Sequence, residues 1–354
     1  MSRLPHLGPA LLLMLGLAVS GLAQDGPQAQ DKAENDAYFA FYNEQDAGTK
    51  ANLGEAFLDD FPESEFRTWA FQLLLTAYTG TRDWQKMIET ADRFDRDVRD
   101  ANAQAQADVF KNAMVAAQQL SDVDKIMEYG GRVLQLDRNN LSVLLTLSQV
   151  IPDNLPVQEG PRERLLQQSF DMANRARIQA RQFFADKPSQ FSDAQWAAER
   201  TQVEKSIYAT LGRVHMERKT YDRAAAEYRR VLGLEPNDVK AHYQLGLSYE
   251  FQAADSSSEV VTAIAAETEA REGDADAASL EGLVAQREAL QDDVLGLMDQ
   301  AIDSFARAVA IAGAGPGGSE ALQRLETLYL IKNEDSLDGL DDLIEAKRSE
   351  IGGA

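Results

Sequence analysis

Histidine and cysteine, the side chains most often used for nucleophilic catalysis and for binding transition metals, are nearly absent from this sequence. Its 354 residues include three histidines and no cysteine. The lack of cysteine excludes disulfides, Cys-ligated zinc or iron–sulfur centres and a thiol nucleophile. His6 lies in an N-terminal apolar segment, and His215 and His242 fall at positions that we expect to pack between helices. We therefore assign no catalytic residue, no metal ligand and no cofactor-binding residue.

One acidic stretch, residues 334–345, imitates a calcium-binding loop. Its oxygen-bearing side chains fall at positions 1, 3, 5, 9 and 12 of such a loop, with Gly339 at position 6: Glu334, Ser336, Asp338, Asp342 and Glu345. That loop type begins with aspartate and has an apolar eighth residue, whereas Glu334 and Asp341 occupy these positions here. We interpret the stretch as the start of a terminal helix.

Charge is plentiful and unevenly distributed. The chain has 58 acidic and 35 basic residues, a net charge of −23, which argues against nucleic-acid binding because phosphates need clustered cations. Residues 161–230 carry 14 basic and 9 acidic side chains, a net +5, whereas residues 252–297 carry 11 acidic and 2 basic, a net −9. We consider three interpretations of the basic segment. It forms ordinary solvated helix faces, it attracts an acidic partner, or the acidic segment folds back over it.

The N-terminus is typical of a secretory signal. Arg3 precedes an apolar run from Leu7 to Val19, and Gly21 and Ala23 provide the small residues of a cleavage site. The run is too short to span a bilayer, which takes about 20 residues. We predict a signal peptide at 1–23, a disordered leader at 24–35, and an exported protein, periplasmic or secreted, with no transmembrane span after cleavage.

A repeat of 34 residues, 205–238, organises the chain. Counted from Lys205, its packing positions 4, 7, 8, 20, 24 and 32 are occupied by Tyr208, Leu211, Gly212, Ala224, Tyr228 and Pro236. Val239 opens another copy, in which Leu245, Gly246 and Tyr249 restate positions 7, 8 and 11, and Ala301 and Phe305 restate positions 20 and 24. Small residues let two helices approach closely, and proline ends the second helix. These residues resemble the tetratricopeptide-repeat (TPR) family.

The resemblance implies an all-α, right-handed solenoid of TPR-like helix-turn-helix repeats with a long acidic helical insertion. We predict diverged repeats at 36–159, the best-conforming repeats with elongated helices at 160–251, the insertion at 252–297, and a C-terminal repeat with a capping helix at 298–348. Residues 151–161 contain three prolines and predict a loop.

Within the insertion, Leu283, Leu290 and Leu297 recur every seven residues and predict one helix of about 35 residues. We expect it to pair with a second helix, which begins at the capping sequence DSSS, residues 255–258. The alternative is a partly disordered acidic segment.

TPR arrays are non-enzymatic scaffolds whose first helices line a concave groove for a protein or peptide partner. The family's groove positions carry over to Lys111, Gln118, Arg213, Glu217, Lys240, Tyr243, Leu247 and Phe251. The cations among them suit an acidic peptide, but the Asn and Lys set of carboxylate-clamp members is not reproduced. Two alternatives remain: a structural or oligomerising envelope protein that self-associates through residues 255–297, and a small-ligand carrier or enzyme with a cavity near residues 151–193.

Overall fold

The protein is described from a computed structural model that covers residues 32–352 apart from 100, 274, 314 and 316. This part of the chain consists of fourteen α-helices, without a strand, which confirms the all-α prediction. The predicted signal peptide and residues 24–31 of the predicted leader lie outside the described residues. No described helix combines the length and the apolar character needed to cross a bilayer.

Two compact units divide the helices. The N-terminal unit comprises the described residues up to Leu155 together with Asn174–Asp186, and the C-terminal unit comprises Pro156–Ala173 and the described residues from Lys187 onward. One long helix, α9 (Glu159–Phe183), contributes residues to both units.

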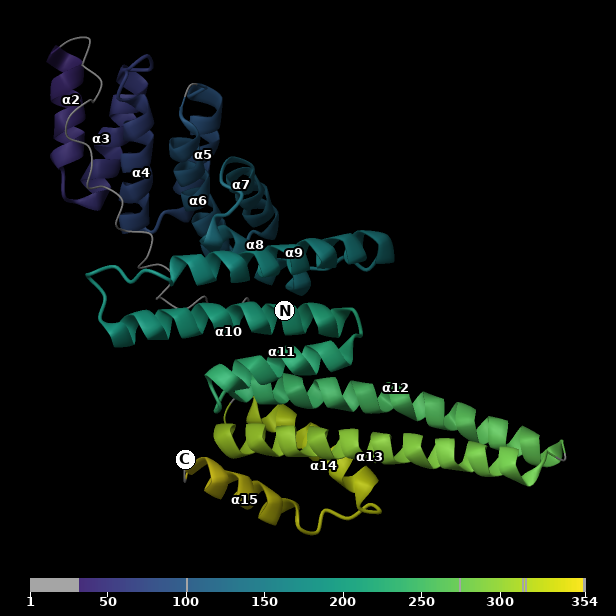
Figure 1. The fold of residues 1–354 in the computed structure, drawn as a ribbon. Helices are drawn as coiled ribbons and strands as arrows, with labels where there is room; N and C mark the ends of the chain where they lie inside the picture. Colours follow the sequence, from purple (N-terminus) through teal and green to yellow (C-terminus); the bar gives the residue numbers. More distant parts are fainter. Residues whose placement is uncertain (1–31, 100, 274, 314, 316, 353–354) are drawn as a thin grey trace. The chain divides into compact units, whose positions relative to one another are not determined.

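The N-terminal unit is a series of antiparallel helix pairs joined by short turns (Figure 1). Its helices are α2 (Lys32–Asn43), α3 (Ala47–Asp60), α4 (Arg67–Thr81), α5 (Trp84–Asp97), α6 (Ala103–Leu120), α7 (Val123–Leu136) and α8 (Leu141–Asp153). Five of them begin at an Asp or Asn whose side chain accepts a backbone N–H in the first turn, which satisfies a donor that the helix itself cannot. Aromatic side chains fill the spaces between the helices, and Phe41, Phe57, Phe71, Phe94 and Tyr129 are fully buried.

The C-terminal unit contains longer helices around one apolar core. After α9 it comprises α10 (Asp193–Glu217), α11 (Tyr221–Leu234), α12 (Val239–Glu272), α13 (Ala277–Ala312), α14 (Gly318–Lys332) and α15 (Leu340–Gly352). The core joins residues of five of these helices, from Ala224 on α11 to Ile344 on α15, with Phe305 at zero exposure. The bases of α12 and α13 are therefore part of the same packed unit as the terminal helices.

Residues 254–272 of α12 and 277–297 of α13 form a helical hairpin, called the arm below (Figure 1). Asp276 caps α13, accepting the N–H of Ser279 at 3.0 Å. The expected separate helix starting at DSSS is wrong, because α12 runs without a break from Val239 to Glu272. The serines do not interrupt it: the Ser257 hydroxyl donates to the Ala253 carbonyl one turn back, a bond compatible with a continuous helix.

Two further boundaries differ from the sequence prediction. Helix α2 already begins at Lys32 and buries Glu34, so residues 32–35 are not part of a disordered leader. The loop predicted at 151–161 is shorter in the structure and comprises residues 154–158. Pro152 lies in the last turn of α8, which Asn154 closes through its N–H to Ile151 and its Nδ2 to Val150. Pro161 is the third residue of α9, where a backbone N–H has no partner within the helix.

Candidate protein-binding surface

The two glycines of the repeat pattern each receive an aromatic ring from the second helix of their repeat. A Cβ on Gly212 of α10 would lie 2.8 Å from Cζ of Tyr228 on α11. A Cβ on Gly246 of α12 would lie 2.7 Å from Cε1 of Phe305 on α13. Because real Cβ contacts are not this short, the helix pairs can approach this closely only with glycine at these positions.

Most of the other residues of the repeat pattern are buried or half-buried. Those buried between the helices are Leu211, Ala224, Leu245, Tyr249 and Ala301. Tyr208 is half-buried, with the Arg230 guanidinium 5.6 Å from its ring centre. Pro236 follows α11 and its carbonyl lies 2.9 Å from Nε2 of His242. The paired helices of the repeat are therefore held by residues that a 34-residue pattern specifies.

The arm is inserted inside one repeat. Gly246 belongs to the first helix of that repeat and Phe305 to its second, yet the arm separates them in the sequence. Both helices run straight from the packed base into the arm. The arm therefore stands where the preceding repeat has the short turn between α10 and α11. Because α12 is one straight element that leads away from the base (Figure 1), the expectation that the acidic segment folds back over the basic one is wrong.

The predicted groove residues belong to both units. Lys111 and Gln118 lie on α6 in the N-terminal unit, whereas the other six lie on α10 and α12 in the C-terminal unit. Nζ of Lys111 donates to Asp108, 3.1 Å away on the same helix. The six residues of the C-terminal unit are therefore the ones that form a set on neighbouring first helices.

On α10, Arg213 and Glu217 form an ion pair with each other. The Arg213 guanidinium lies 3.0 Å from one oxygen of Glu217, and the Arg162 side chain of α9 pairs with the other. The Arg213 side chain is 41% exposed, so this is a surface ion pair whose two charges partly compensate each other. Arg162 could not be paired with Glu217 from the sequence, because the contact depends on how α9 stacks on α10.

On α12, Lys240 is exposed and the three apolar candidates are half-buried. The Tyr243 ring lies 5.7 Å from that of Phe305, and Leu247 packs against the same core cluster. Phe251 packs against Tyr221 at the start of α11, with ring centres 5.4 Å apart. Each apolar side chain therefore has one face in the core and one face accessible to a partner.

Residues of α14 extend this surface. Arg324 donates to Glu250 of α12 at 2.8 Å, so the first helices of successive repeats are tied together. Ile331, near the C-terminal end of α14, is 65% exposed. The same repeat register, continued to α14, places Ile331 at a groove position, which is the sequence signal that would have identified it. The candidate surface is thus α10, α12 and α14, with Lys240, Tyr243, Leu247, Phe251 and Ile331.

Cations of the basic segment 161–230 pair with carboxylates inside the segment and just beyond it. Arg218 pairs with Glu163 at 2.6 Å, and Lys205 pairs with Asp238 at 3.0 Å as well as with Glu235. Burial opposes the charge on Lys205, but its two carboxylate partners outweigh burial and raise its pKa. The segment is also divided between the two units, since Asn174–Asp186 belongs to the N-terminal one. These pairs favour ordinary helix faces over a continuous basic surface.

Both helical histidines are buried packing residues. Nδ1 of His215 lies 2.9 Å from the Thr220 hydroxyl, and burial, with help from Arg223 and Arg218, lowers its pKa. Burial also lowers the pKa of His242, against the opposing effect of its bond to the Pro236 carbonyl. Among the described residues, no group of three or more His, Asp or Glu side chains is arranged to hold a metal ion.

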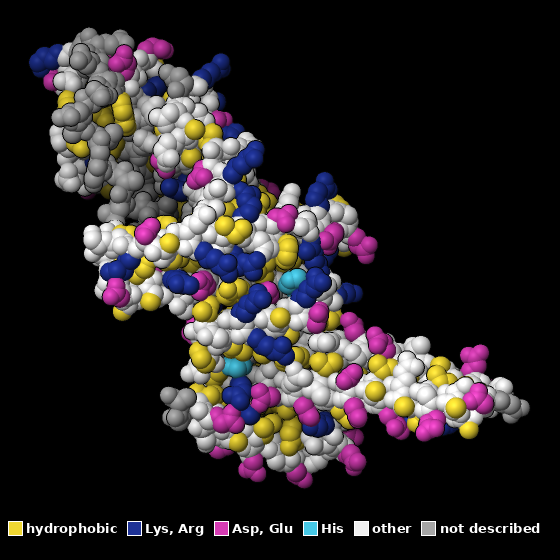
Figure 2. Space-filling view, viewed as in Figure 1, with side chains coloured by type: hydrophobic (Ala, Val, Ile, Leu, Met, Phe, Trp, Pro, Cys, Tyr) yellow, Lys and Arg dark blue, Asp and Glu magenta, His cyan; other side chains and the backbone are white. Residues whose placement is uncertain are grey.

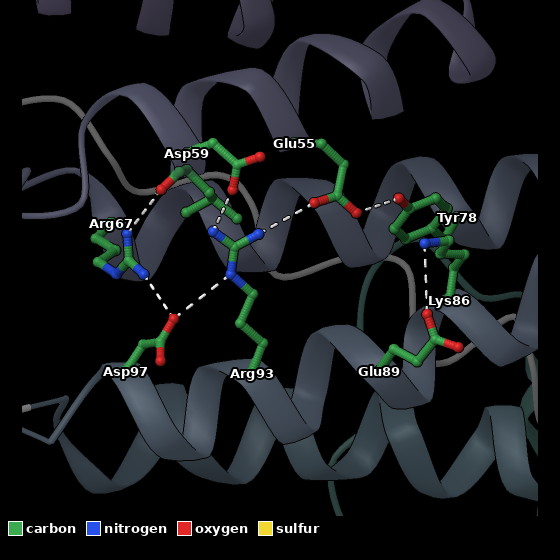
Figure 3. Close-up of polar contacts among 9 residues, drawn as sticks. Glu55, Asp59, Arg67, Tyr78, Lys86, Glu89, Arg93 and Asp97 are labelled. Atoms are coloured by element: carbon green, nitrogen blue, oxygen red, sulfur yellow. Dashed lines mark hydrogen bonds and ion pairs between the residues drawn. The ribbon is translucent and has the colours of Figure 1, made fainter.

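In the N-terminal unit, polar contacts tie three helices together rather than form a site (Figure 3). Arg93 of α5 reaches Glu55 at 3.2 Å and Asp59 at 2.6 Å on α3. Arg67 of α4 pairs with Asp97 at 2.7 Å. The Tyr78 hydroxyl donates to Glu55, and burial together with this bond raises the tyrosine pKa. Since these groups satisfy one another, the cluster has a structural role.

Antiparallel helix pairs with glycine packed against an aromatic ring define a helical-repeat scaffold. The family model of the TPR repeat matches residues 212–252, which run from the end of α10 through α11 into α12. This segment therefore matches a tetratricopeptide repeat, as the repeat pattern predicts. Proteins of this family generally act as scaffolds for protein–protein interaction.

Solved structures that are similar to this chain include the following two. One is a tetratricopeptide repeat protein from Parabacteroides merdae, with 10% identity and a TM-score of 0.42, covering 83% of this chain and 99% of that one. The other is the C-terminal part of a TPR repeat-containing protein from Cytophaga hutchinsonii, with 10% identity and a TM-score of 0.40, covering 87% of this chain and 98% of that one. No curated protein matches the sequence.

Proposed function

We propose that the protein is an exported, non-enzymatic scaffold that binds a segment of a partner protein across α10, α12 and α14 of the C-terminal unit. The observation that carries the proposal is the exposed Lys240 on the same helix as the half-buried Tyr243 and Leu247. Lys240 has no ion-pair partner among the residues that the structure describes. An apolar floor with an uncompensated cation favours a segment that carries both an apolar anchor and a carboxylate.

The aromatic side chains of the proposed surface are already held in place by packing before a ligand binds. Tyr243 is held against Phe305 and Phe251 against Tyr221, so these side chains lose little conformational freedom when a ligand covers their accessible faces. Arg213 is held on α10 by its ion pair with Glu217, whereas Lys240 has no such pair among the described residues, so we take Lys240 as the charge that selects the ligand. The proposed ligand is therefore an acidic peptide with at least one aromatic or aliphatic side chain.

Selection from a random peptide library on the purified full chain tests this proposal. We expect the selected peptides to be enriched in Asp or Glu next to apolar residues, and Lys240→Glu to weaken their binding by about tenfold or more. The matched control is Arg223→Glu, which reverses an exposed cation on the second helix α11 and should leave affinity unchanged. Peptides without acidic residues, or equal binding by the Lys240 variant, would contradict the proposal.

The export part of the proposal is supported by the apolar run Leu7–Val19 and the small residues at Gly21 and Ala23. Cell fractionation followed by intact mass measurement tests it directly. We expect the protein outside the cytoplasm with Gln24 as its first residue. A chain in the cytoplasm that still begins at Met1 would refute export without affecting the binding surface.

A further inference from the structure

We propose that the arm is a second docking surface, separate from the proposed groove, and that it binds a basic amphipathic helix of a partner protein. The exposed apolar residues of the hairpin share one side, and carboxylates lie beside them.

The arm is a two-helix coiled coil with a defined seam. Buried and half-buried residues recur at alternating spacings of three and four along both helices, which is the coiled-coil pattern. The seam residues are Ala253, Val260, Ala263 and Glu267 on α12, and Leu283, Arg287, Leu290, Val294 and Leu297 on α13. The Arg287 guanidinium lies 2.9 Å from the buried Glu267 carboxylate, and this pair fixes the register of the two helices.

The register places the remaining apolar residues on one side of the hairpin. Val260 and Val294 are each two helical turns from the Glu267–Arg287 pair, toward the base, so they face one another. In an antiparallel pair, the residues that follow facing seam residues project to the same side. Val261 and Leu295 therefore share one side, and Ile264, which follows the seam residue Ala263, lies there too.

This apolar side, formed by Val261, Ile264 and Leu295, is exposed. The three side chains are 66%, 44% and 48% accessible, and they are the exposed large hydrophobic residues of the described arm. An apolar set concentrated on one side of a projecting hairpin is the kind of stripe that an amphipathic helix covers. Half-buried Val284 continues it toward the tip of the arm.

Charge identifies the occupant. Exposed carboxylates line the α13 edge of this side: Glu281, Glu288 and Asp292. Figure 2 shows acidic and hydrophobic side chains next to one another along the arm. A second copy of the chain would bring one segment of net charge −9 against another, which costs electrostatic energy. A helix with one apolar face and flanking Lys or Arg instead gains from both features.

The test uses a fluorescent peptide of about 18 residues in which leucine follows the helical period and lysine fills the other positions. Anisotropy with the full chain should show binding that weakens with salt, while a leucine–glutamate peptide of the same pattern should not bind. The double variant Val261→Ser/Leu295→Ser keeps every charge and should weaken binding by about tenfold or more. The matched control, Ala266→Ser/Ala289→Ser on the opposite side of the arm, should bind as the unaltered chain does.

Other results would overturn the proposal. Unchanged affinity of the Val261/Leu295 variant would mean that the peptide senses only the overall negative charge. Tighter binding by Lys240→Glu with no loss in the arm variant would place the basic peptide in the groove. A dimer detected by light scattering and abolished by the arm variant would identify the face as a contact between copies. Circular dichroism of every variant verifies that the helices remain intact.

Discussion

Gly246 lies directly under the Phe305 ring: a Cβ on this glycine would come within 2.7 Å of Cε1 and 2.8 Å of Cδ1. Phe305 has no exposed surface, so its ring has no free space to move into. This contact joins the two helices of a repeat that the arm separates in sequence. It shows that the repeat is closed at its base independently of how its helices are connected.

Replacing Gly246 with alanine should therefore destabilise the C-terminal unit. Overpacking costs about 1–3 kcal/mol, and the higher helix propensity of alanine returns up to about 1 kcal/mol. We expect a net loss of about 1–2 kcal/mol in urea unfolding. Gly296→Ala on α13 is the control: nothing lies within 4 Å of its Cβ position, so this variant should gain about 0.5–1 kcal/mol. Equal effects of the two substitutions would disprove the close packing.

The N-terminal network around Arg93 offers a comparison of buried and exposed ion pairs (Figure 3). Arg93 is 25% exposed and contacts three carboxylates, whereas Lys86 and Glu89 on the same helix are both at least 50% exposed. We expect Arg93→Met to cost about 1–2 kcal/mol, because Glu55, Asp59 and Asp97 would repel one another, and Lys86→Met to cost less than about 0.5 kcal/mol. Thermal melts of both variants at low and high salt measure these losses of stability. A loss in the Lys86 variant as large as that in the Arg93 variant would contradict this difference.

The periodic features of the fold were predictable from the sequence. Glycines at position 8 and aromatic residues at position 24 are local signals, and they identified Gly212, Tyr228, Gly246 and Phe305 as packing residues. That each ring packs on the glycine of its own repeat became evident only in the structure. The heptad leucines similarly predicted the long α13. These signals succeed because the helical period and the inter-helix distance fix which residues meet.

Contacts that depend on stacking were not predictable. The pairing of Glu217 with Arg162 requires α9 to lie against α10, and no local pattern encodes this. The DSSS sequence was misread as a cap because a serine hydroxyl can equally bond to the carbonyl one turn earlier, and pairing with α13 decides in favour of the continuous helix. The Arg213–Glu217 ion pair, by contrast, has the i,i+4 spacing of a local signal on α10, and only its link to Arg162 depends on stacking.

The buried Glu267–Arg287 pair should control the stability of the arm. Glu267 is 7% and Arg287 is 22% exposed. Arg287→Met leaves the carboxylate with only the exposed Arg271 as a cation, and should destabilise the arm by about 1–3 kcal/mol. Hydrogen exchange of residues 254–297 should accelerate while that of α10 and α11 stays constant.

The double variant Glu267→Leu/Arg287→Leu is the control for this prediction. It removes both charges and extends the apolar seam, so protection of the arm should return to or exceed its original level. Slow exchange in the single variant would show that the ion pair is dispensable.

Stability should fall as the pH is lowered through the histidine range. The pKa values of His215 and His242 are lowered by burial from an ordinary value of 6.5, so the unfolded chain takes up protons at a higher pH than the folded chain. Below pH 6.5 each histidine should therefore cost up to about 1.4 kcal/mol per pH unit, until its folded-state pKa is reached. Protonated His242 would also carry a buried Nδ1–H without a partner among the described residues.

Urea unfolding at pH 7.5, 6.5 and 5.5 measures this effect. His242→Gln removes one titrating group, so the loss between pH 6.5 and 5.5 should be smaller in the variant than in the unaltered chain. An identical pH dependence in the two proteins would show that His242 does not contribute.

Removing the arm should leave the repeat folded. In the register of residues 205–238, Lys219 and Thr220 of the turn and Tyr221 at the start of α11 occupy positions 15 to 17, and the corresponding segment of the next repeat is 253–298. Replacing 253–298 with Lys-Thr-Tyr preserves Gly246, Ala301 and Phe305, and shortening a connection adds no loop-closure cost. We expect the stability of the remaining unit to change by less than about 1 kcal/mol in urea unfolding. Phe305→Ala in the same shortened chain is the control and should cost about 3–5 kcal/mol, because it empties the space above Gly246. If the shortened chain instead fails to fold while full-length Phe305→Ala remains stable, the arm and not the glycine–aromatic contact would hold the two helices together.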